Sequence, residues 1–220
     1  MYIQLNSQVI YYERTGEGSP VILLHGNNET HEIFDELIPK LSDKHSVYAL
    51  DMRGHGLSAT PKDYHYKDMA SDVLNMIEAL EIKKPALIGF SDGAIVSLLC
   101  AIEHSNMLSS VVCCGANLSF DGIKFSQQHA IKKEYRKNND PKTLMMIKEP
   151  DIPLDLLKRI SVPALIVAGE DDCIKERETK SIAANIPDSE LMILPKEDHY
   201  SYIIHSDKMA EPIETFLKKY

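Results

Sequence analysis

The sequence predicts an α/β fold in which helices flank a mostly parallel central sheet. Short apolar runs of strand length alternate with longer segments of helical periodicity along most of the chain. Several of these runs are continuously apolar, as is typical of strands buried on both faces of a parallel sheet. This alternation implies βαβ units with right-handed crossovers. Because ligands bind beyond the carboxyl ends of such strands, we expect functional residues directly after the apolar runs.

The expected elements follow one another in this order. The N-terminal segment alternates apolar and polar residues on either side of 6–8, which predicts a hairpin. Further strands are expected at 21–26, 46–50, 86–90, 109–116, 163–168 and 190–194, and helices at 30–43, 67–81, 93–104, 175–186 and 206–219. Pro39 is expected to kink or shorten the first of these helices.

One segment, 118–159, breaks the alternation of strands and helices. It is polar, rich in Lys and Asn, and interrupted by prolines. It enters at the sheet edge where we expect the functional residues, so we interpret it as a short cap inserted into a core domain formed by 1–117 and 160–220. Phe120, in this cap, is a candidate for lining a substrate pocket.

Composition limits the class of protein. The chain has 220 residues, of which 44% are hydrophobic and 26% charged, as in ordinary globular domains. A net charge of −9 disfavours nucleic acid and anionic membranes as partners. No apolar run approaches the roughly 20 residues that span a bilayer. The N-terminus lacks the pattern of a secretory signal, so we expect a cytoplasmic protein.

The cysteine and histidine pattern predicts no metal and no disulfide scaffold. The four cysteines include no CxxC pair, and no HExxH motif or dense group of metal-ligating residues is present. Cys173 alone lies in a polar loop, where an incidental free thiol is the simplest interpretation.

The segment Gly89-Phe90-Ser91-Asp92-Gly93 joins an expected strand to an expected helix within very few residues. A serine hydroxyl attacks only when it is exposed beside a base, and a tight strand-to-helix corner projects it above the sheet. The glycines leave room for the strand and helix to approach. The backbone N–H of Asp92 can then donate to a developing oxyanion. Alone the pattern is weak, because an ordinary helix N-cap has the same residues.

Two further strand ends carry the partners that such a serine needs. Gly169-Glu170-Asp171-Asp172 follows the strand at 163–168, and His199 follows the last strand. Serine, acid and histidine thus occur in this order at three strand ends. The histidine would accept the serine proton, and a carboxylate would orient its ring and stabilise the imidazolium. In isolation, His199 is more typical of a histidine in a surface loop.

Taken together, the motifs resemble those of the α/β-hydrolase superfamily throughout the chain, apart from the expected cap. The matching segments are LLHGNN (23–28), ALDMRGHGLS (49–58), GFSDG (89–93), VAGEDD (167–172) and EDHY (197–200). The resemblance implies a catalytic triad of Ser91, Asp172 and His199. It also implies an oxyanion hole formed by the backbone N–H groups of Asn27 and Asp92, with no cofactor.

Two acidic positions leave alternatives open. Relatives place the acid three residues after the strand-end glycine, which favours Asp172, although the adjacent Asp171 competes with it. Asp92 departs from the glutamine or methionine that is common directly after the nucleophile. Its carboxylate would favour cationic substrates such as those bearing an amine, or would simply complement the dipole of a helix N-terminus.

The loop within ALDMRGHGLS has a structural interpretation. We expect Asp51, Arg53 and Ser58 to brace this loop through mutual bonds rather than to take part in catalysis. His25 is likewise expected to brace a loop rather than to carry protons.

The sequence therefore predicts a serine hydrolase that cleaves a small to medium carboxylic ester or thioester through an acyl-enzyme. Carbon–carbon hydrolysis, amide hydrolysis and cofactor-free lyase chemistry use the same triad and remain alternatives. A non-catalytic ligand-binding protein on the same fold is the alternative outside enzymes. The remaining candidates for the substrate pocket are Asn28, Phe90 and Tyr200.

Overall fold

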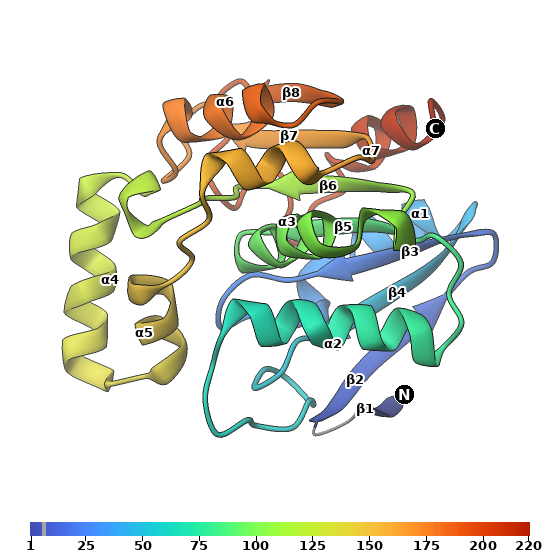
Figure 1. Ribbon diagram of the computed structural model, residues 1–220, viewed down its shortest axis with the longest axis horizontal. Helices are drawn as coiled ribbons and strands as arrows, with labels where there is room; N and C mark the ends of the chain where they lie inside the picture. Colours follow the sequence, from blue (N-terminus) through green and yellow to red (C-terminus); the bar gives the residue numbers. More distant parts are fainter. Residues whose placement is uncertain (6–7) are drawn as a thin grey trace.

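The computed structural model describes residues 1–5 and 8–220 and has an eight-stranded sheet between two layers of helices (Figure 1). The strands are β1 (Tyr2–Leu5), β2 (Gln8–Thr15), β3 (Ser19–Leu24), β4 (His45–Asp51), β5 (Ala86–Phe90), β6 (Ser110–Cys114), β7 (Ala164–Gly169) and β8 (Ser189–Leu194). The helices are α1 (Leu37–Leu41), α2 (Tyr66–Ala79), α3 (Asp92–His104), α4 (Phe125–Asn138), α5 (Pro141–Lys148), α6 (Glu176–Asn185) and α7 (Ala210–Leu217). The predicted α/β fold is confirmed.

The order of strands in the sheet is β1-β2-β4-β3-β5-β6-β7-β8. Strands β1 and β2 pair antiparallel, as do β2 and β4, and all later neighbours pair parallel. The predicted N-terminal hairpin is therefore present, although positions 6–7 of its turn lie outside the described residues. Because β3, β5, β6, β7 and β8 are adjacent and parallel, the segments that follow them emerge at one edge of the sheet.

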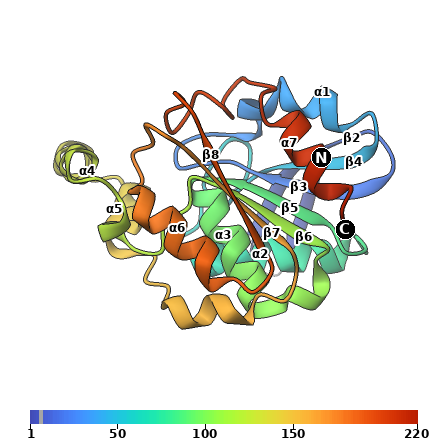
Figure 2. The ribbon, with the colours of Figure 1, turned by 90° about the horizontal axis from the view of Figure 1, so that it is seen from above.

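Helices cover both faces of the sheet (Figure 2). Helices α1 and α7 pack on one face over a buried cluster that includes Leu37 and Ile213. Helices α2, α3 and α6 pack on the other, over a cluster that includes Ile77 and Ile95. None of the helices in the described residues combines the length and apolarity that crossing a membrane requires.

The helix expected at 30–43 is divided in two. A 3-10 turn occupies His31–Phe34, and α1 begins only at Leu37. Proline has no N–H and its ring clashes with the carbonyl four residues earlier, so a continuous helix cannot pass through Pro39. Because α1 begins at Leu37, Pro39 lies in its first turn, where backbone N–H groups have no acceptor within the helix and the missing N–H of proline costs nothing.

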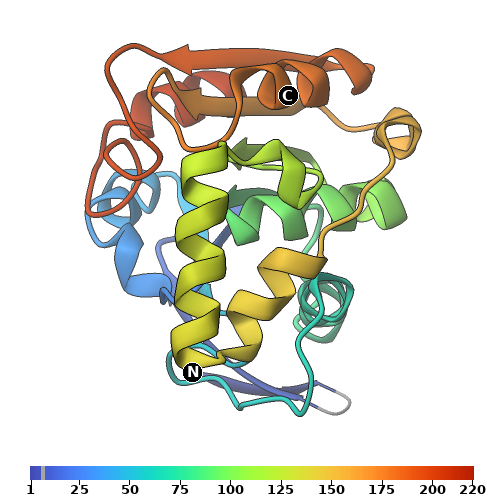
Figure 3. The same ribbon diagram turned by 90° about the vertical axis from the view of Figure 1, so that its left-hand side faces the viewer.

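The segment 118–159 contributes α4 and α5, which lie outside the helical layers at the edge where the parallel strands end (Figures 1 and 3). An isolated β-bridge between Ser119 and Asp151 joins the two ends of the segment, and a second one between Ile123 and Ile174 joins the segment to the core. Helix α4 buries only Ile131. Helix α4 is therefore thinly packed compared with the sheet, whereas Met145 and Leu157 elsewhere in the segment are buried in the main core.

The loop after β4 is braced as expected. Both oxygens of the buried Asp51 accept hydrogen bonds: Oδ1 from the backbone and ring nitrogens of His31, at 2.9 and 2.7 Å, and Oδ2 from the Leu57 N–H at 2.8 Å. Ser58 Oγ donates to the Asp51 carbonyl and accepts the Tyr11 N–H. Although burial raises the pKa of Asp51, these bonds outweigh that effect and lower it. The carboxylate thus fixes the loop.

The ion pair between Arg53 and Asp72 offers a test of this bracing. Arg53 donates to Asp72 through Nε at 2.7 Å and Nη2 at 2.8 Å, and both side chains are buried. It also lies 3.1 Å from the exposed carboxylate of Asp68. We expect Asp72→Ala to lower the free energy of unfolding by about 3–5 kcal/mol, because a buried guanidinium loses its buried partner and keeps only the exposed Asp68.

Asp68→Ala is the matched control, since it removes an exposed partner of the same arginine. We expect this variant to lose less than about 1 kcal/mol. Urea denaturation followed by circular dichroism measures both values. Equal losses would contradict the assignment of the buried pair as the stabilising one.

Candidate active site

Ser91 lies at the corner between β5 and α3 with a strained backbone. Its φ of 51° and ψ of −114° fall in a region that costs a residue with a side chain about 1–3 kcal/mol. The surrounding contacts hold it there: the Ser91 N–H donates to the Cys114 carbonyl on β6 at 2.8 Å, and its carbonyl accepts from Ala94 and Ile95 at 3.0 and 3.1 Å. The hydroxyl is thereby projected above the sheet edge.

Close packing around the corner depends on two glycines. A Cβ on Gly93 would collide with the Leu24 carbonyl on β3, and a Cβ on Gly89 would collide with the carbonyl of Gly93. Only residues without a side chain allow α3 to approach the strands this closely. The corner predicted from the sequence is present.

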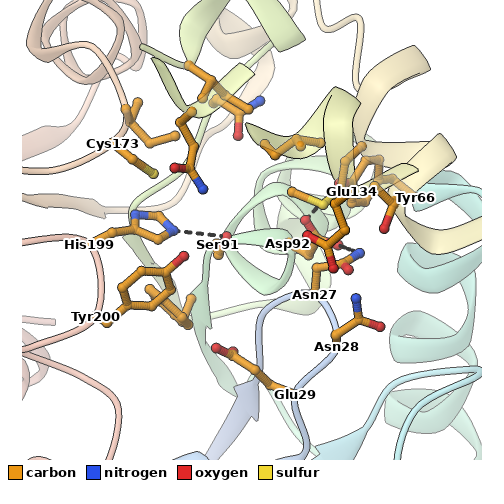
Figure 4. Close-up of a pocket in the computed structure, with 18 residues that line it drawn as sticks. Asn27, Asn28, Glu29, Tyr66, Ser91, Asp92, Glu134, Cys173, His199 and Tyr200 are labelled. Carbon is orange, nitrogen blue, oxygen red and sulfur yellow. Dashed lines mark hydrogen bonds between the residues drawn. The ribbon is translucent and has the colours of Figure 1, made fainter. Parts of the chain in front are cut away.

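The structure brings together the three residues predicted as a triad. His199 Nε2 lies 3.1 Å from Ser91 Oγ, as Figure 4 shows, and His199 Nδ1 lies 2.7 Å from Asp172 Oδ1. Burial lowers the pKa of His199, but its bonds to Asp172 and Cys173 outweigh burial and raise it. The Asp172 carboxylate thus orients the ring and can stabilise the imidazolium that forms when the ring accepts a proton from the serine.

The two adjacent acids have different surroundings. Asp172 is buried, and its Oδ1 also accepts the Ile174 N–H at 2.8 Å. Asp171 is exposed, and its backbone N–H donates to the Glu197 carbonyl at 2.9 Å. The geometry therefore places Asp172 rather than Asp171 beside His199.

Asp92 links the loop after β3 to the start of α3. Its Oδ2 accepts from Asn27 Nδ2 at 2.9 Å, and its Oδ1 accepts from the Tyr66 hydroxyl at 2.7 Å. Burial raises the pKa of Asp92, and these two donors offset that effect only in part, so the pKa stays above its usual value. Because Asp92 is the first residue of α3, its backbone N–H has no intrahelical acceptor and is free to donate to a ligand.

A cavity of about 260 Å³ opens in front of Ser91. Of the predicted pocket residues, Asn28, Phe90, Asp92 and Tyr200 line it. Phe120 does not. It packs instead against a cluster formed by Ile123, Ile131 and Ile174, with the Lys132 Nζ 5.0 Å from its ring centroid. Its apolar ring thus serves the packing of the segment against the loop after β7 rather than facing the cavity.

The lining also contains residues that the sequence analysis missed. Gln127, Ile131 and Glu134 come from one face of α4, at a spacing that helical periodicity predicts. Glu29 comes from the loop after β3, two residues beyond Asn27, and no motif marks it. Among the described residues that line the cavity, three carry carboxyl groups, namely Glu29, Asp92 and Glu134, and none is a lysine or arginine. The cavity is therefore electrostatically suited to a neutral or cationic ligand.

Asp172, Cys173 and His199 also form a group with potential metal ligands. One atom of each lies within 4.8 Å of the others. The hydrogen bond between Asp172 and His199 already joins two of these side chains, which favours the interpretation as acid and base.

Comparisons with known proteins agree with this architecture. A family model described as the alpha/beta hydrolase fold matches residues 19–156. The chain is 30% identical to serine hydrolase BPHL of Homo sapiens, over 98% of this chain and 85% of that protein. It is 25% identical to 2-hydroxy-6-oxo-6-(2'-aminophenyl)hexa-2,4-dienoic acid hydrolase of Metapseudomonas resinovorans, over 94% and 87%. An esterase from Exiguobacterium antarcticum has a similar structure, with a TM-score of 0.86 at 22% identity and coverage of 99% and 98%.

The adjacent acids allow a direct test of the site. Asp172→Asn keeps the size of the side chain but removes the charge that orients His199, so we expect a fluorophosphonate to label Ser91 about a thousandfold more slowly. Asp171→Asn, the control, should react at the rate of the unmodified protein. Intact mass spectrometry over time gives both rates. Slow labelling of the Asp171 variant alone would assign the acid to Asp171.

Proposed function

The chain belongs to the α/β-hydrolase fold family, and we propose that it is a serine hydrolase cleaving a small to medium carboxylic ester or thioester. The observation that carries the proposal is the hydrogen-bonded series from Ser91 through His199 to Asp172, set below a cavity. The human relative named as a serine hydrolase supports the same class of reaction.

The proposed reaction has two halves. Ser91 Oγ attacks the substrate carbonyl while His199 Nε2 accepts its proton, and the backbone N–H groups of Asn27 and Asp92 donate to the oxyanion. The tetrahedral intermediate collapses, and the leaving alcohol or thiol takes the proton from His199. Water then loses a proton to His199 and attacks the acyl-enzyme. The carboxylic acid departs, and the proton returns to Ser91.

The size of the cavity supports a modest acyl group. At about 260 Å³ it lies below the usual range of pockets for drug-sized ligands. We infer that the 118–159 segment is a cap that sets this size, since Ile131 and Glu134 of α4 form part of the lining.

Carbon–carbon bond hydrolysis is the second candidate, and the relative from Metapseudomonas resinovorans favours it. The neutral side chains of Asn117 and Gln127 in the lining can donate hydrogen bonds to the keto oxygens of such a substrate. The same triad serves both reactions. Turnover of a vinylogous 1,5-diketone acid, with no turnover of simple esters, would favour this candidate over the ester hydrolase.

Ser91→Ala tests the central proposal. We expect the unmodified protein to form one fluorophosphonate adduct and to hydrolyse p-nitrophenyl acetate and butyrate faster than octanoate, because the cavity is small. The alanine variant should form no adduct and lose at least about a thousandfold in kcat, since no other group replaces the hydroxyl. A folded unmodified protein with neither adduct nor turnover would instead support a ligand-binding protein.

Asp92→Asn tests whether this carboxylate selects amine-bearing acyl groups. The substrates are an α-amino acid p-nitrophenyl ester and its analogue without the amine. If the carboxylate binds the ammonium group, the ratio of their kcat/KM values should fall about fivefold to tenfold in the variant. An unchanged ratio would show that Asp92 does not select the substrate and only accepts hydrogen bonds from Asn27 and Tyr66 at the start of α3.

A further inference from the structure

Glu29 lies beside Ser91, yet the proposed reaction does not use it. Its Oε2 accepts the Gly26 N–H at 2.9 Å, which folds the side chain back toward the sheet edge. A Cβ placed on Gly26 would lie 2.6 Å from this oxygen and 3.1 Å from Ser91 Cβ. The carboxyl group and the serine therefore flank the same glycine.

Glu29 and Asp92 lie on different sides of Ser91. Asp92 is bonded to Tyr66 on α2. Glu29 Oε2 and the ring of Phe90 both lie against Gly26, where an added Cβ would be 2.6 Å from the oxygen and 3.2 Å from Phe90 Cε1. Phe90 in turn packs against His199, with ring centroids 5.0 Å apart. Figure 4 shows the same division, with Glu29 on the side of Tyr200 and Asp92 on the side of Tyr66.

This division assigns each carboxyl group to a different part of the substrate. His199 has to return its proton to the leaving group, so the leaving group must depart on the side of His199. Glu29 lies on that side and Asp92 does not. No lysine or arginine among the described lining residues is present to neutralise Glu29.

We propose that Glu29 determines specificity for the leaving group, by forming a subsite for a positively charged amino group on the alcohol portion of the ester. The inference rests on the proposed ester hydrolase function. A carboxylate in a partly buried pocket attracts a cation more strongly than one in bulk water, because the effective dielectric constant is lower. Recognition of this kind favours a cationic alcohol over a neutral one of the same shape.

The charge of Glu29 changes near neutral pH. Burial raises the pKa of Glu29 to about 7. The hydrogen bond from the Gly26 N–H and the charge of His199 lower the pKa, but burial outweighs them. Asp92 raises it further, and His205 lowers it. Tyr200 also faces Glu29, and its pKa is raised by burial and by the neighbouring acids. The preference for a cation should therefore strengthen as the pH rises through 7 and Glu29 loses its proton.

The experiment compares two esters of the same acid, choline butyrate and 3,3-dimethylbutyl butyrate, which differ mainly by the positive charge. For the unmodified protein at pH 8, we expect kcat/KM to favour the choline ester about fivefold to tenfold, and less at pH 6. Titration of His199 affects both esters and cancels in the ratio. Glu29→Gln should bring the ratio close to one at both pH values, because the amide oxygen still accepts the Gly26 N–H but carries no charge.

Asp92→Asn is the matched control, since it removes a carboxylate from the other side of the same pocket and should leave this ratio unchanged at pH 8. At pH 6 the ratio should rise slightly, because Asp92 no longer raises the pKa of Glu29. A ratio that Glu29→Gln does not alter would overturn the inference while leaving the ester hydrolase intact. Equal slowing of both esters by Glu29→Ala, with the ratio unchanged, would also overturn it and assign Glu29 to loop geometry alone. A folded protein that cleaves neither these esters nor p-nitrophenyl esters would overturn the proposed function itself.

Discussion

The close approach of α3 to β3 is the contact on which the rest of the site depends. Gly93 brings the start of α3 against the Leu24 carbonyl, where no side chain fits. The chain has to turn sharply to reach this position, and Ser91 carries the strain in its positive φ. The same approach brings the helix N-terminus beside the loop after β3. The Ser91 hydroxyl, the positive end of the helix dipole and Asn27, whose side chain donates to Asp92, thus lie around the same cavity.

Strand order explains why the sequence locates much of this site. Parallel neighbours end on the same edge, so apolar runs followed by polar residues are sufficient to bring Ser91 and His199 together. The choice between Asp171 and Asp172 is different, because it depends on the direction of each side chain within a tight loop. Backbone N–H groups of that loop hold the Asp172 carboxylate inward and leave Asp171 in solvent. The spacing of apolar residues in the sequence does not predict such hydrogen bonds between backbone and side chain.

The pocket lining is less predictable than the strand ends. Glu29 lies in a loop with no periodicity, and only its bond to the Gly26 N–H directs it toward the cavity. Phe120 is apolar and follows the carboxyl end of β6 by six residues, yet it packs against Ile123, Ile131 and Ile174 instead of lining the cavity. An apolar residue in a small insertion can either line a cavity or pack the insertion itself. Which of the two it does depends on how much other apolar surface the insertion contains.

Helix α4 has fourteen residues and buries only Ile131. Gln127 and Glu134, on either side of it along the helix, face the cavity without supporting the core. Substitutions at such positions change the free energy of unfolding very little. Selection can therefore alter the chemical character of the cavity through α4 while the sheet keeps its stability.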